Sequence, residues 1–220
     1  MLKRIFISLA FIFIAITVVS AQPFADEIAA FKKADSIDYP FKGIHPIVFA
    51  GSSSFRLWKN MQGDFPGYPI LNRGFGGATL PDLIRYVNDV IIKYAPKQVV
   101  IYCGENDFAS SDSITAKMVF SNFKKLYHII RNELPQTPIV YISMKPSPSR
   151  EKLQEKVKAA NAKIKKFLHH KEDCTYIDIY SLMLNEDGSM KPEIYISDRL
   201  HMNEKGYAIW IKAIQPYLLK

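Results

Sequence analysis

The chain has 220 residues, of which 48% are hydrophobic, 13% aromatic and 23% charged. This composition excludes a disordered or low-complexity chain and fits one compact domain with a substantial core. The net charge of +8 is moderate, and the Lys and Arg residues are spread over several predicted helices without a dense basic block. We therefore expect a solvated basic surface and no nucleic-acid binding.

Residues 1–21 have the pattern of a secretory signal peptide. Two basic residues precede a long apolar run, and small residues stand before a cut expected ahead of Gln22. Cleavage would leave a single domain over residues 22–220 with a net charge of +6, because Lys3 and Arg4 are lost. The expected location is secreted or periplasmic, with no stable membrane insertion after cleavage. An uncleaved segment would instead tether the domain to a membrane.

The remaining chain alternates helices and strands. The expected helices are 24–35, 55–61, 80–94, 114–134, 150–170 and 204–218, the last of them capped by Asn203. The expected strands are 47–50, 68–71, 98–103, 138–143 and 175–179. Short apolar strands that alternate with helices indicate a parallel sheet with helices on both faces. The sequence therefore predicts an α/β fold, a three-layer α/β/α sandwich around a five-stranded parallel sheet.

Polar or glycine-rich segments follow several of these strands. Residues 51–54, 72–79 and 104–107 come after the first, second and third strands, and residues 198–201 follow the fifth. In parallel sheets, ligands bind outside the carboxyl ends of the strands. We therefore expect all four segments to meet at one edge of the sheet.

These segments carry the residue types of nucleophilic catalysis. Asp198 and His201 are three residues apart, so the carboxylate can hold one ring nitrogen and leave the other free. Such a pair needs a hydroxyl to act on, and the serines at 52–54 supply one. The Asn106 amide and the glycine-rich backbone at 74–79 can donate to a developing negative charge. Taken singly, each of these residues also has a common structural role as a cap, turn or surface residue.

Four segments carry a family resemblance: Gly51-Ser52-Ser53, Gly74-Phe75-Gly76-Gly77-Ala78-Thr79, Gly104-Glu105-Asn106-Asp107 and Asp198-Arg199-Leu200-His201. In order and spacing they resemble the sequence blocks of the SGNH, or GDSL-type, hydrolases, in particular the branch of platelet-activating-factor acetylhydrolase-like proteins. The resemblance covers nearly all of the chain after residue 21. It implies a flavodoxin-like fold and ester hydrolysis without a metal or an organic cofactor.

The resemblance also implies roles for single residues. Ser53 would be the nucleophile, His201 the general base and Asp198 its orienting acid. The oxyanion donors would be the N–H groups of Ser53 and Gly77 and the side-chain amide of Asn106. One departure concerns the first block, which commonly reads Gly-Asp-Ser, whereas Ser52 stands at the Asp position here. That Asp is not the triad acid, so the chemistry should survive.

Four basic residues lie in the predicted loops near this edge: Arg73, Lys145, Arg150 and Arg199. They would favour an acidic substrate if they line the rim of the site, and otherwise they form structural or surface ion pairs. Cys103 and Cys174 fall at opposite ends of their predicted strands, so we expect two small thiols and no disulfide.

The expected substrate is a short-chain acyl ester, above all an acetyl ester, of a carbohydrate or similar small molecule, because the sequence shows no lid or extra hydrophobic domain. Three alternatives remain open. The protein could be a lysophospholipase or thioesterase for longer acyl chains. It could be a non-catalytic module that binds acylated glycans. It could also be a metal-dependent phosphoesterase that uses Asp107, Asp198 and His201.

Overall fold

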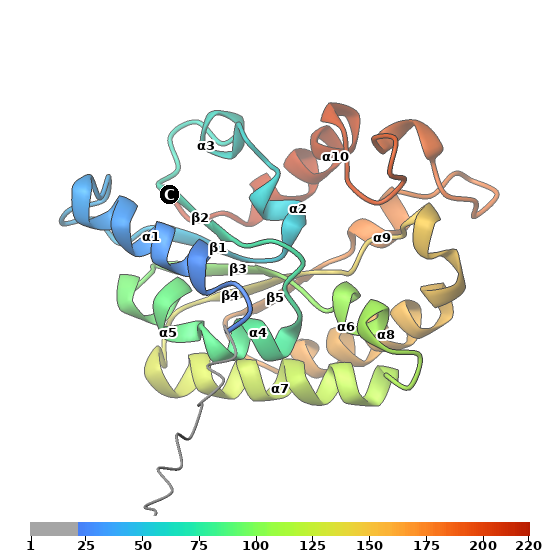
Figure 1. Ribbon diagram of the computed structural model, residues 1–220, viewed down its shortest axis with the longest axis horizontal. Coiled ribbons are helices and arrows are strands. Elements are labelled where there is room, and N and C mark those ends of the chain that lie inside the picture. The colour runs from blue at the N-terminus through green and yellow to red at the C-terminus, as the bar shows by residue number, and fades with distance from the viewer. Residues whose placement is uncertain (1–21) are drawn as a thin grey trace, which may run out of the picture.

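A computed structural model describes residues 22–220. The secretory segment expected at residues 1–21 lies outside the described residues. A parallel sheet forms the middle of the molecule (Figure 1). Its strands are β1 (Ile47–Gly51), β2 (Ile70–Gly74), β3 (Gln98–Tyr102), β4 (Ile139–Ile142) and β5 (Cys174–Ile177). They lie in the order β2-β1-β3-β4-β5, and all four pairings are parallel. This flavodoxin-like order confirms the predicted fold class.

Helices connect the strands. The α-helices are α1 (Ala25–Ile37), α2 (Ser53–Arg56), α3 (Met61–Asp64), α4 (Leu80–Arg85), α5 (Val87–Val90), α6 (Glu105–Ser110), α7 (Ala116–Glu133), α8 (Gln154–His169), α9 (Ile179–Leu182) and α10 (Glu204–Ile214). Over residues 22–220 there are also four short 3₁₀ helices: η1 (Ile92–Tyr94), η2 (Pro148–Leu153), η3 (Pro192–Ile194) and η4 (Gln215–Tyr217).

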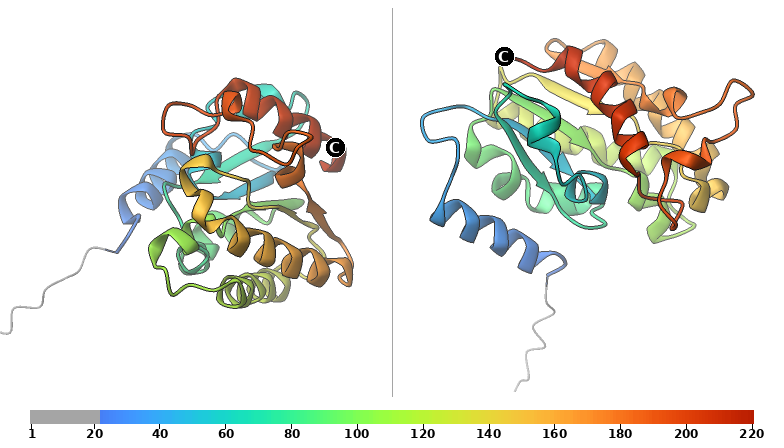
Figure 2. Two further views of the ribbon diagram at one scale, coloured as in Figure 1. Left: turned by 90° about the vertical axis from the view of Figure 1, so that its right-hand side faces the viewer. Right: turned by 90° about the horizontal axis from the view of Figure 1, so that it is seen from above.

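Each face of the sheet has its own hydrophobic core, because successive strand residues point to opposite sides. In β1, Val48 packs in the core beneath α1, α4, α5, α7 and α8, whereas Phe49 packs in the core beneath α2, α3, α9 and α10. Figures 1 and 2 show these two groups of helices on opposite sides of the sheet. The three layers follow from strands that are apolar on both faces.

Strand order reverses between β1 and β3, so the carboxyl ends of these strands border the crevice in which such folds bind ligands. Gly51 at the end of β1 lies in register with Tyr102 at the end of β3 and with Gly74 at the end of β2. The segments that follow all three strands therefore begin at the same edge.

Several boundaries differ from the sequence expectations. The second strand continues to Gly74 because Asn72 and Arg73 find polar partners within the fold, although their polarity is typical of a loop. The expected helix at 80–94 is divided into α4, α5 and η1, with non-helical backbone at Ile91. The expected helix at 150–170 begins only at Gln154, after η2. Helices α6 and α9 were not expected at all.

Both cysteines are free thiols, as expected, although Cys174 is only partly buried. Asn203 caps α10, as expected, because its side-chain oxygen accepts hydrogen bonds from the N–H groups of Lys205 and Gly206. Over residues 22–220, the structure contains no helix with the length and apolar character needed to cross a membrane.

Candidate active site

Ser53 is the first residue of α2, directly beyond the carboxyl end of β1. The sequence had predicted that this helix would begin at residue 55, so the serine run was expected in a loop. The helix packs closely against β2 because Gly74 has no side chain: a Cβ at this position would lie 2.5 Å from Cβ of Phe55. The Asn72 amide fixes the same helix by donating to the Phe55 carbonyl at 2.7 Å. The hydroxyl of Ser53 is thus held on a rigid turn.

Asp198 and His201 lie in a closed turn that leads into α10. Tyr195 and Met202 form an antiparallel bridge, and the N–H of Ile196 donates to the His201 carbonyl at 2.9 Å. Within the turn, Oδ1 of Asp198 accepts hydrogen bonds from the N–H groups of Leu200 and His201, both at 2.8 Å. One carboxylate oxygen therefore stabilises the turn while the other is free to contact the imidazole.

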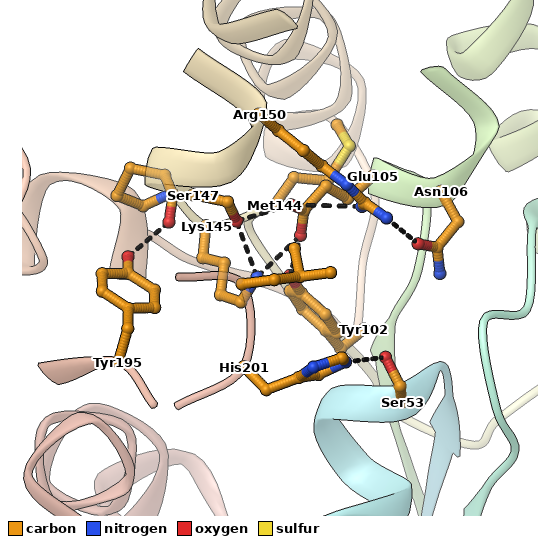
Figure 3. Close-up of polar contacts among 12 residues, drawn as sticks. Ser53, Tyr102, Glu105, Asn106, Met144, Lys145, Ser147, Arg150, Tyr195 and His201 are labelled. Carbon is orange, nitrogen blue, oxygen red and sulfur yellow. Dashed lines mark hydrogen bonds and ion pairs between the residues drawn. The ribbon is translucent and has the colours of Figure 1, made fainter. Parts of the chain in front are cut away.

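The structure brings the predicted trio together. Nδ1 of His201 lies 2.6 Å from Oδ2 of Asp198, and Nε2 lies 2.9 Å from Oγ of Ser53, a residue 148 positions earlier in the chain. Figure 3 shows the imidazole directed at the serine hydroxyl. The side chain of His201 is 21% exposed and that of Asp198 is 42% exposed. The site is thus open to substrate.

The charge state of Asp198 fixes the direction of these hydrogen bonds. Partial burial raises the pKa of this carboxyl, but hydrogen bonds from the His201 ring and two backbone N–H groups outweigh burial, so the pKa lies below its ordinary value. An ionised carboxylate can only accept, so Nδ1 of His201 carries the ring proton. Nε2 is then an acceptor, and the Ser53 hydroxyl donates to it. This is the arrangement that a general base requires.

Two backbone N–H groups near the trio lack acceptors. Within the described part of the chain, neither the N–H of Ser53 nor that of Gly77 donates to a protein acceptor. Gly77 has φ +59, a left-handed conformation that glycine adopts without steric cost. Phe75, two residues earlier, donates its N–H to the Gly51 carbonyl at 3.0 Å, which holds this loop against the end of β1.

Asn106 lies in the first turn of α6. Its Nδ2 donates to the Ala78 carbonyl at 3.1 Å, which brings the amide to the loop that contains Gly77. Its Oδ1 accepts a hydrogen bond from Nη2 of Arg150 at 2.8 Å. The predicted nucleophile, base, acid and amide donor thus lie at one edge of the sheet, on segments that are distant in sequence.

Two of the four basic residues predicted for the rim are not on it. Arg73 is 8% exposed and forms an ion pair with Asp35 of α1, on the side of the sheet away from α2. Lys145 has 1% of its side chain exposed and pairs with Glu105 at 2.9 Å. Both instead form structural ion pairs, the alternative to a rim position, with acidic partners that are remote in sequence. Arg150 is mostly buried and contacts Asn106, whereas Arg199 is exposed beside Asp198.

Glu105, which is not among the residues predicted for the site, is the centre of a buried polar network. Its carboxylate contacts Nζ of Lys145 at 2.9 Å, Nη1 of Arg150 at 3.3 Å, Oγ of Ser147 at 2.5 Å and the hydroxyl of Tyr102 at 2.8 Å. Burial raises the pKa of Glu105, but the two cations outweigh burial and hold the pKa below its ordinary value. The sequence does contain one indication of this network: an acidic residue stands between an apolar strand and Asn106.

Asp107 does not join the trio. Its Oδ2 accepts a hydrogen bond from the N–H of Leu80 at 2.9 Å, so the carboxylate stabilises the first turn of α4. Among residues 22–220, no three His, Cys, Asp or Glu side chains are grouped as metal ligands would be. The arrangement needed for a phosphoesterase that uses Asp107, Asp198 and His201 is therefore not formed.

Burial raises the pKa of Asp107 to about 6 from its ordinary value of 3.8. The folded state then binds the proton more tightly, so stability falls as pH rises from about 4 through 6. Asp107→Asn lacks this titration, and we expect it to gain about 2 kcal/mol relative to wild type between pH 4 and pH 7. Urea unfolding at both pH values measures the gain, and an equal difference at both values would contradict it.

A sequence model of the GDSL-like lipase/acylhydrolase family matches residues 47–209 of this chain. The match spans all five strands and includes Ser53, Asn106 and His201. The chain belongs to this family. Members of this family are serine hydrolases that cleave ester bonds, so the protein is a GDSL-type acylhydrolase.

Solved structures share the fold of this acylhydrolase. A protein from Streptococcus pneumoniae described as a platelet activating factor is 20% identical with a TM-score of 0.75, over 88% of this chain and 92% of that chain. A GDSL-like lipase from Bacteroides thetaiotaomicron is 21% identical with a TM-score of 0.71, over 86% and 97%. A catalytic mutant of an acetylxylan esterase from Geobacillus stearothermophilus is 14% identical with a TM-score of 0.63, over 78% and 93%. No curated protein sequence matched this acylhydrolase.

Proposed function

We propose that this acylhydrolase is an exported serine esterase that hydrolyses short-chain acyl esters, above all acetyl esters of carbohydrates. Ser53 is its nucleophile, His201 the general base and Asp198 the residue that orients the base. The observation that carries the proposal is the hydrogen-bond chain from Ser53 through His201 to Asp198, with separations of 2.9 and 2.6 Å.

The reaction has two steps. As Oγ of Ser53 bonds to the ester carbonyl carbon, Nε2 of His201 takes the serine proton, and Asp198 stabilises the imidazolium that forms. The tetrahedral intermediate collapses when the C–O bond to the alcohol breaks and His201 returns the proton to the leaving oxygen. Water then attacks the acyl-Ser53 ester while Nε2 of His201 takes its proton. As the bond between the acyl carbon and Oγ breaks and the acid leaves, His201 returns this proton to Oγ of Ser53. Protein side chains carry every proton transfer.

Three N–H donors stabilise the oxyanion of both intermediates: the backbone N–H groups of Ser53 and Gly77 and the Nδ2 amide of Asn106. The two backbone groups have no protein acceptor within residues 22–220, so they are available to the substrate. Removal of one such donor typically costs about 3 to 4 kcal/mol of transition-state stabilisation.

The surface beside His201 supports a polar leaving group. Ser149 and Arg199 are exposed there, and the N–H of Ser149 donates to the Arg199 carbonyl at 3.1 Å. The same turn exposes Ile196, an apolar side chain of a size that can pack on one face of a sugar ring. The acetylxylan esterase that shares the fold also points to acetylated carbohydrates.

Export rests on the sequence of residues 1–21 alone, with its basic start, apolar run and small residues before Gln22. The proposal places the mature enzyme in the periplasm or the medium, where polymeric glycans are accessible.

One experiment tests the whole proposal. The native protein is recovered from the medium or the cell envelope, its mass is measured, and it is treated with a fluorophosphonate probe and assayed with p-nitrophenyl acetate, p-nitrophenyl octanoate, acetylated xylo-oligosaccharides and a lysophospholipid. We expect the mass of a chain that begins at Gln22, and the fluorophosphonate label on Ser53. The kcat/KM for acetyl esters should be at least about tenfold above that for octanoyl esters.

The other outcomes each contradict a part of the proposal. Labelled protein that prefers octanoyl esters or the lysophospholipid would indicate a long-chain acylhydrolase. Protein that takes no label and turns over nothing but still binds the acetylated oligosaccharide would be a recognition module. Hydrolysis that a chelator abolishes would remove the serine mechanism, and an N-terminus at Met1 would remove signal cleavage.

A further inference from the structure

The side chain behind the oxyanion amide is Arg150. We propose that Arg150 is a positioning residue that fixes the orientation of the Asn106 amide and polarises it, with Glu105 as the group that holds Arg150. This proposal rests on the proposed function, because it assigns the task of Arg150 within the same ester hydrolysis.

The contacts of Asn106 allow only one orientation of its amide. Nη2 of Arg150 is a donor and meets Oδ1 of Asn106, whereas the Ala78 carbonyl is an acceptor and meets Nδ2. If the amide were turned by 180°, donor would face donor at Arg150 and acceptor would face acceptor at Ala78. In the observed orientation, one hydrogen on Nδ2 is bound to Ala78 and the other remains free to donate to the oxyanion.

Arg150 itself is held in place by a second contact. Its Nη1 lies 3.3 Å from Oε1 of Glu105, and its side chain is 17% exposed. The residue has non-helical backbone angles of φ −121 and ψ 30 within η2, and its N–H donates to the Ser147 carbonyl at 2.8 Å. Two nitrogens of one planar group therefore bridge Glu105 and Asn106, which a single ammonium group cannot reproduce.

Glu105, the residue that holds Arg150, is itself held in place by other side chains. It is fixed by Lys145, Ser147 and Tyr102, and Lys145 also donates to Oγ of Ser147 at 2.7 Å. Figure 3 shows the resulting chain of contacts from Tyr102 and Lys145 through Glu105 and Arg150 to Asn106. Within residues 22–220, each buried side-chain nitrogen and oxygen has a hydrogen-bond partner, so this network is fully satisfied.

The same loop also contacts the turn that carries the base. The N–H of Ser149 donates to the Arg199 carbonyl at 3.1 Å, and the hydroxyl of Tyr195 donates to the Pro146 carbonyl. Residues 146–150 thus connect the amide donor on one side of the site with the Asp198–His201 turn on the other. A change at Arg150 acts on the oxyanion side of this connection, because its side chain contacts Asn106 and not His201.

The positive charge of Arg150 adds to the effect of orientation. A guanidinium that donates to an amide oxygen draws electron density from the amide and makes its N–H groups stronger donors. The stabilisation grows as the negative charge develops on the substrate oxygen, so Arg150 should affect kcat more than KM.

The test uses Arg150→Met, which keeps the length of the aliphatic side chain and removes the guanidinium. We expect kcat for p-nitrophenyl acetate to fall about 10- to 100-fold, with KM changed less than about threefold. Asn106→Ala should lower kcat about 10²- to 10³-fold. In the Asn106→Ala background, Arg150→Met should lower kcat by no more than about threefold, because the amide through which it acts is absent.

A matched control is Arg131→Met. Arg131 is also partly buried and its Nη1 donates to the carbonyls of Pro135 and Thr137, but it lies at the far end of α7 from Asn106. This variant should retain the wild-type kcat. If Arg150→Met does not fold, Arg150→Ala with added guanidinium replaces it, and we expect guanidinium to raise kcat of that variant and not of Asn106→Ala.

Two results would overturn the positioning role: a wild-type kcat in Arg150→Met, or full additivity of the Arg150 and Asn106 effects in the double variant. Neither result affects the labelling of Ser53 by the fluorophosphonate, so the proposed function would stand. Conversely, turnover by a protein that never labels on Ser53 would remove the proposed function whatever Arg150 does.

Discussion

Ser53→Ala should lower kcat for p-nitrophenyl acetate by about 10⁴- to 10⁶-fold, because it removes the only atom that can form the acyl-enzyme in the proposed reaction. Folding should be unaffected. Ser53 is partly exposed, and among residues 22–220 its hydroxyl has a side-chain hydrogen bond to His201 alone, at 2.9 Å. The measurements are steady-state kinetics, fluorophosphonate labelling and thermal unfolding of the purified variant.

The chain supplies two matched controls, since Ser53 lies between two other serines. Ser52 is 4% exposed and Ser54 is 3% exposed, so neither hydroxyl faces a substrate. Ser52→Ala and Ser54→Ala should keep kcat within about threefold of wild type, because neither removes the nucleophile. A large loss of activity in either control, together with activity retained in Ser53→Ala, would move the nucleophile to the other serine and contradict the assignment.

The sequence could predict where Ser53, Asp198 and His201 lie, because sequence proximity and the geometry of parallel sheets indicate the same place. Ser53 and Asn106 each lie directly after an apolar strand, and parallel strands bring their carboxyl ends to one edge. The Asp198–His201 turn also follows a strand, β5, but only after α9 and η3. Asp198 and His201 are also close in sequence, so their contact needs no knowledge of the fold. The contact between His201 and Ser53 depends wholly on the sheet order.

The environment of the charged residues could not be predicted in this way. Lys145 pairs with Glu105 across 40 positions, and Arg73 pairs with Asp35 across 38. Without the fold, a Lys or Arg is expected in solvent, since burial of an unpaired charge is costly. The sequence therefore leaves a rim position and an ion pair as alternatives for both residues, and the structure shows a buried ion pair for each of them.

The prediction of secondary structure from the sequence was wrong where tertiary contacts override the local preference of the residues. The polar residues of Gly104–Asp107 are typical of a loop, yet Glu105 begins α6 because its side chain is satisfied by Lys145 and Ser147. The glycine before it adopts φ +123, which places the chain at a sharp turn into the helix. As a result, Asn106 lies on a helical turn, and both ends of its amide have hydrogen-bond partners.

Glu105→Gln should lower the free energy of unfolding by about 3 to 5 kcal/mol, the cost of leaving buried cations without their counter-charge. The Glu105 side chain is 6% exposed, and the Lys145 ammonium and the Arg150 guanidinium both contact it. The new amide would also direct N–H groups at donors that now meet a carboxylate oxygen. Urea unfolding at pH 7 measures the loss. Glu155→Gln, which breaks an exposed pair with Lys158, is the control and should leave the midpoint unchanged.

Lys145→Met separates a charge imbalance from a loss of packing. In the wild-type background this change removes a partner of buried Glu105 and should destabilise the protein. In the Glu105→Gln background the same change removes an uncompensated buried cation and should raise stability, so its effect reverses sign. Burial lowers the pKa of Lys145 while Glu105 raises it. Without Glu105 the folded state therefore favours the neutral amine, and the stability of Glu105→Gln should increase as pH rises toward the ordinary lysine pKa. If Lys145→Met destabilises both backgrounds equally, the lysine contributes by packing, and the buried charge balance does not govern this part of the fold.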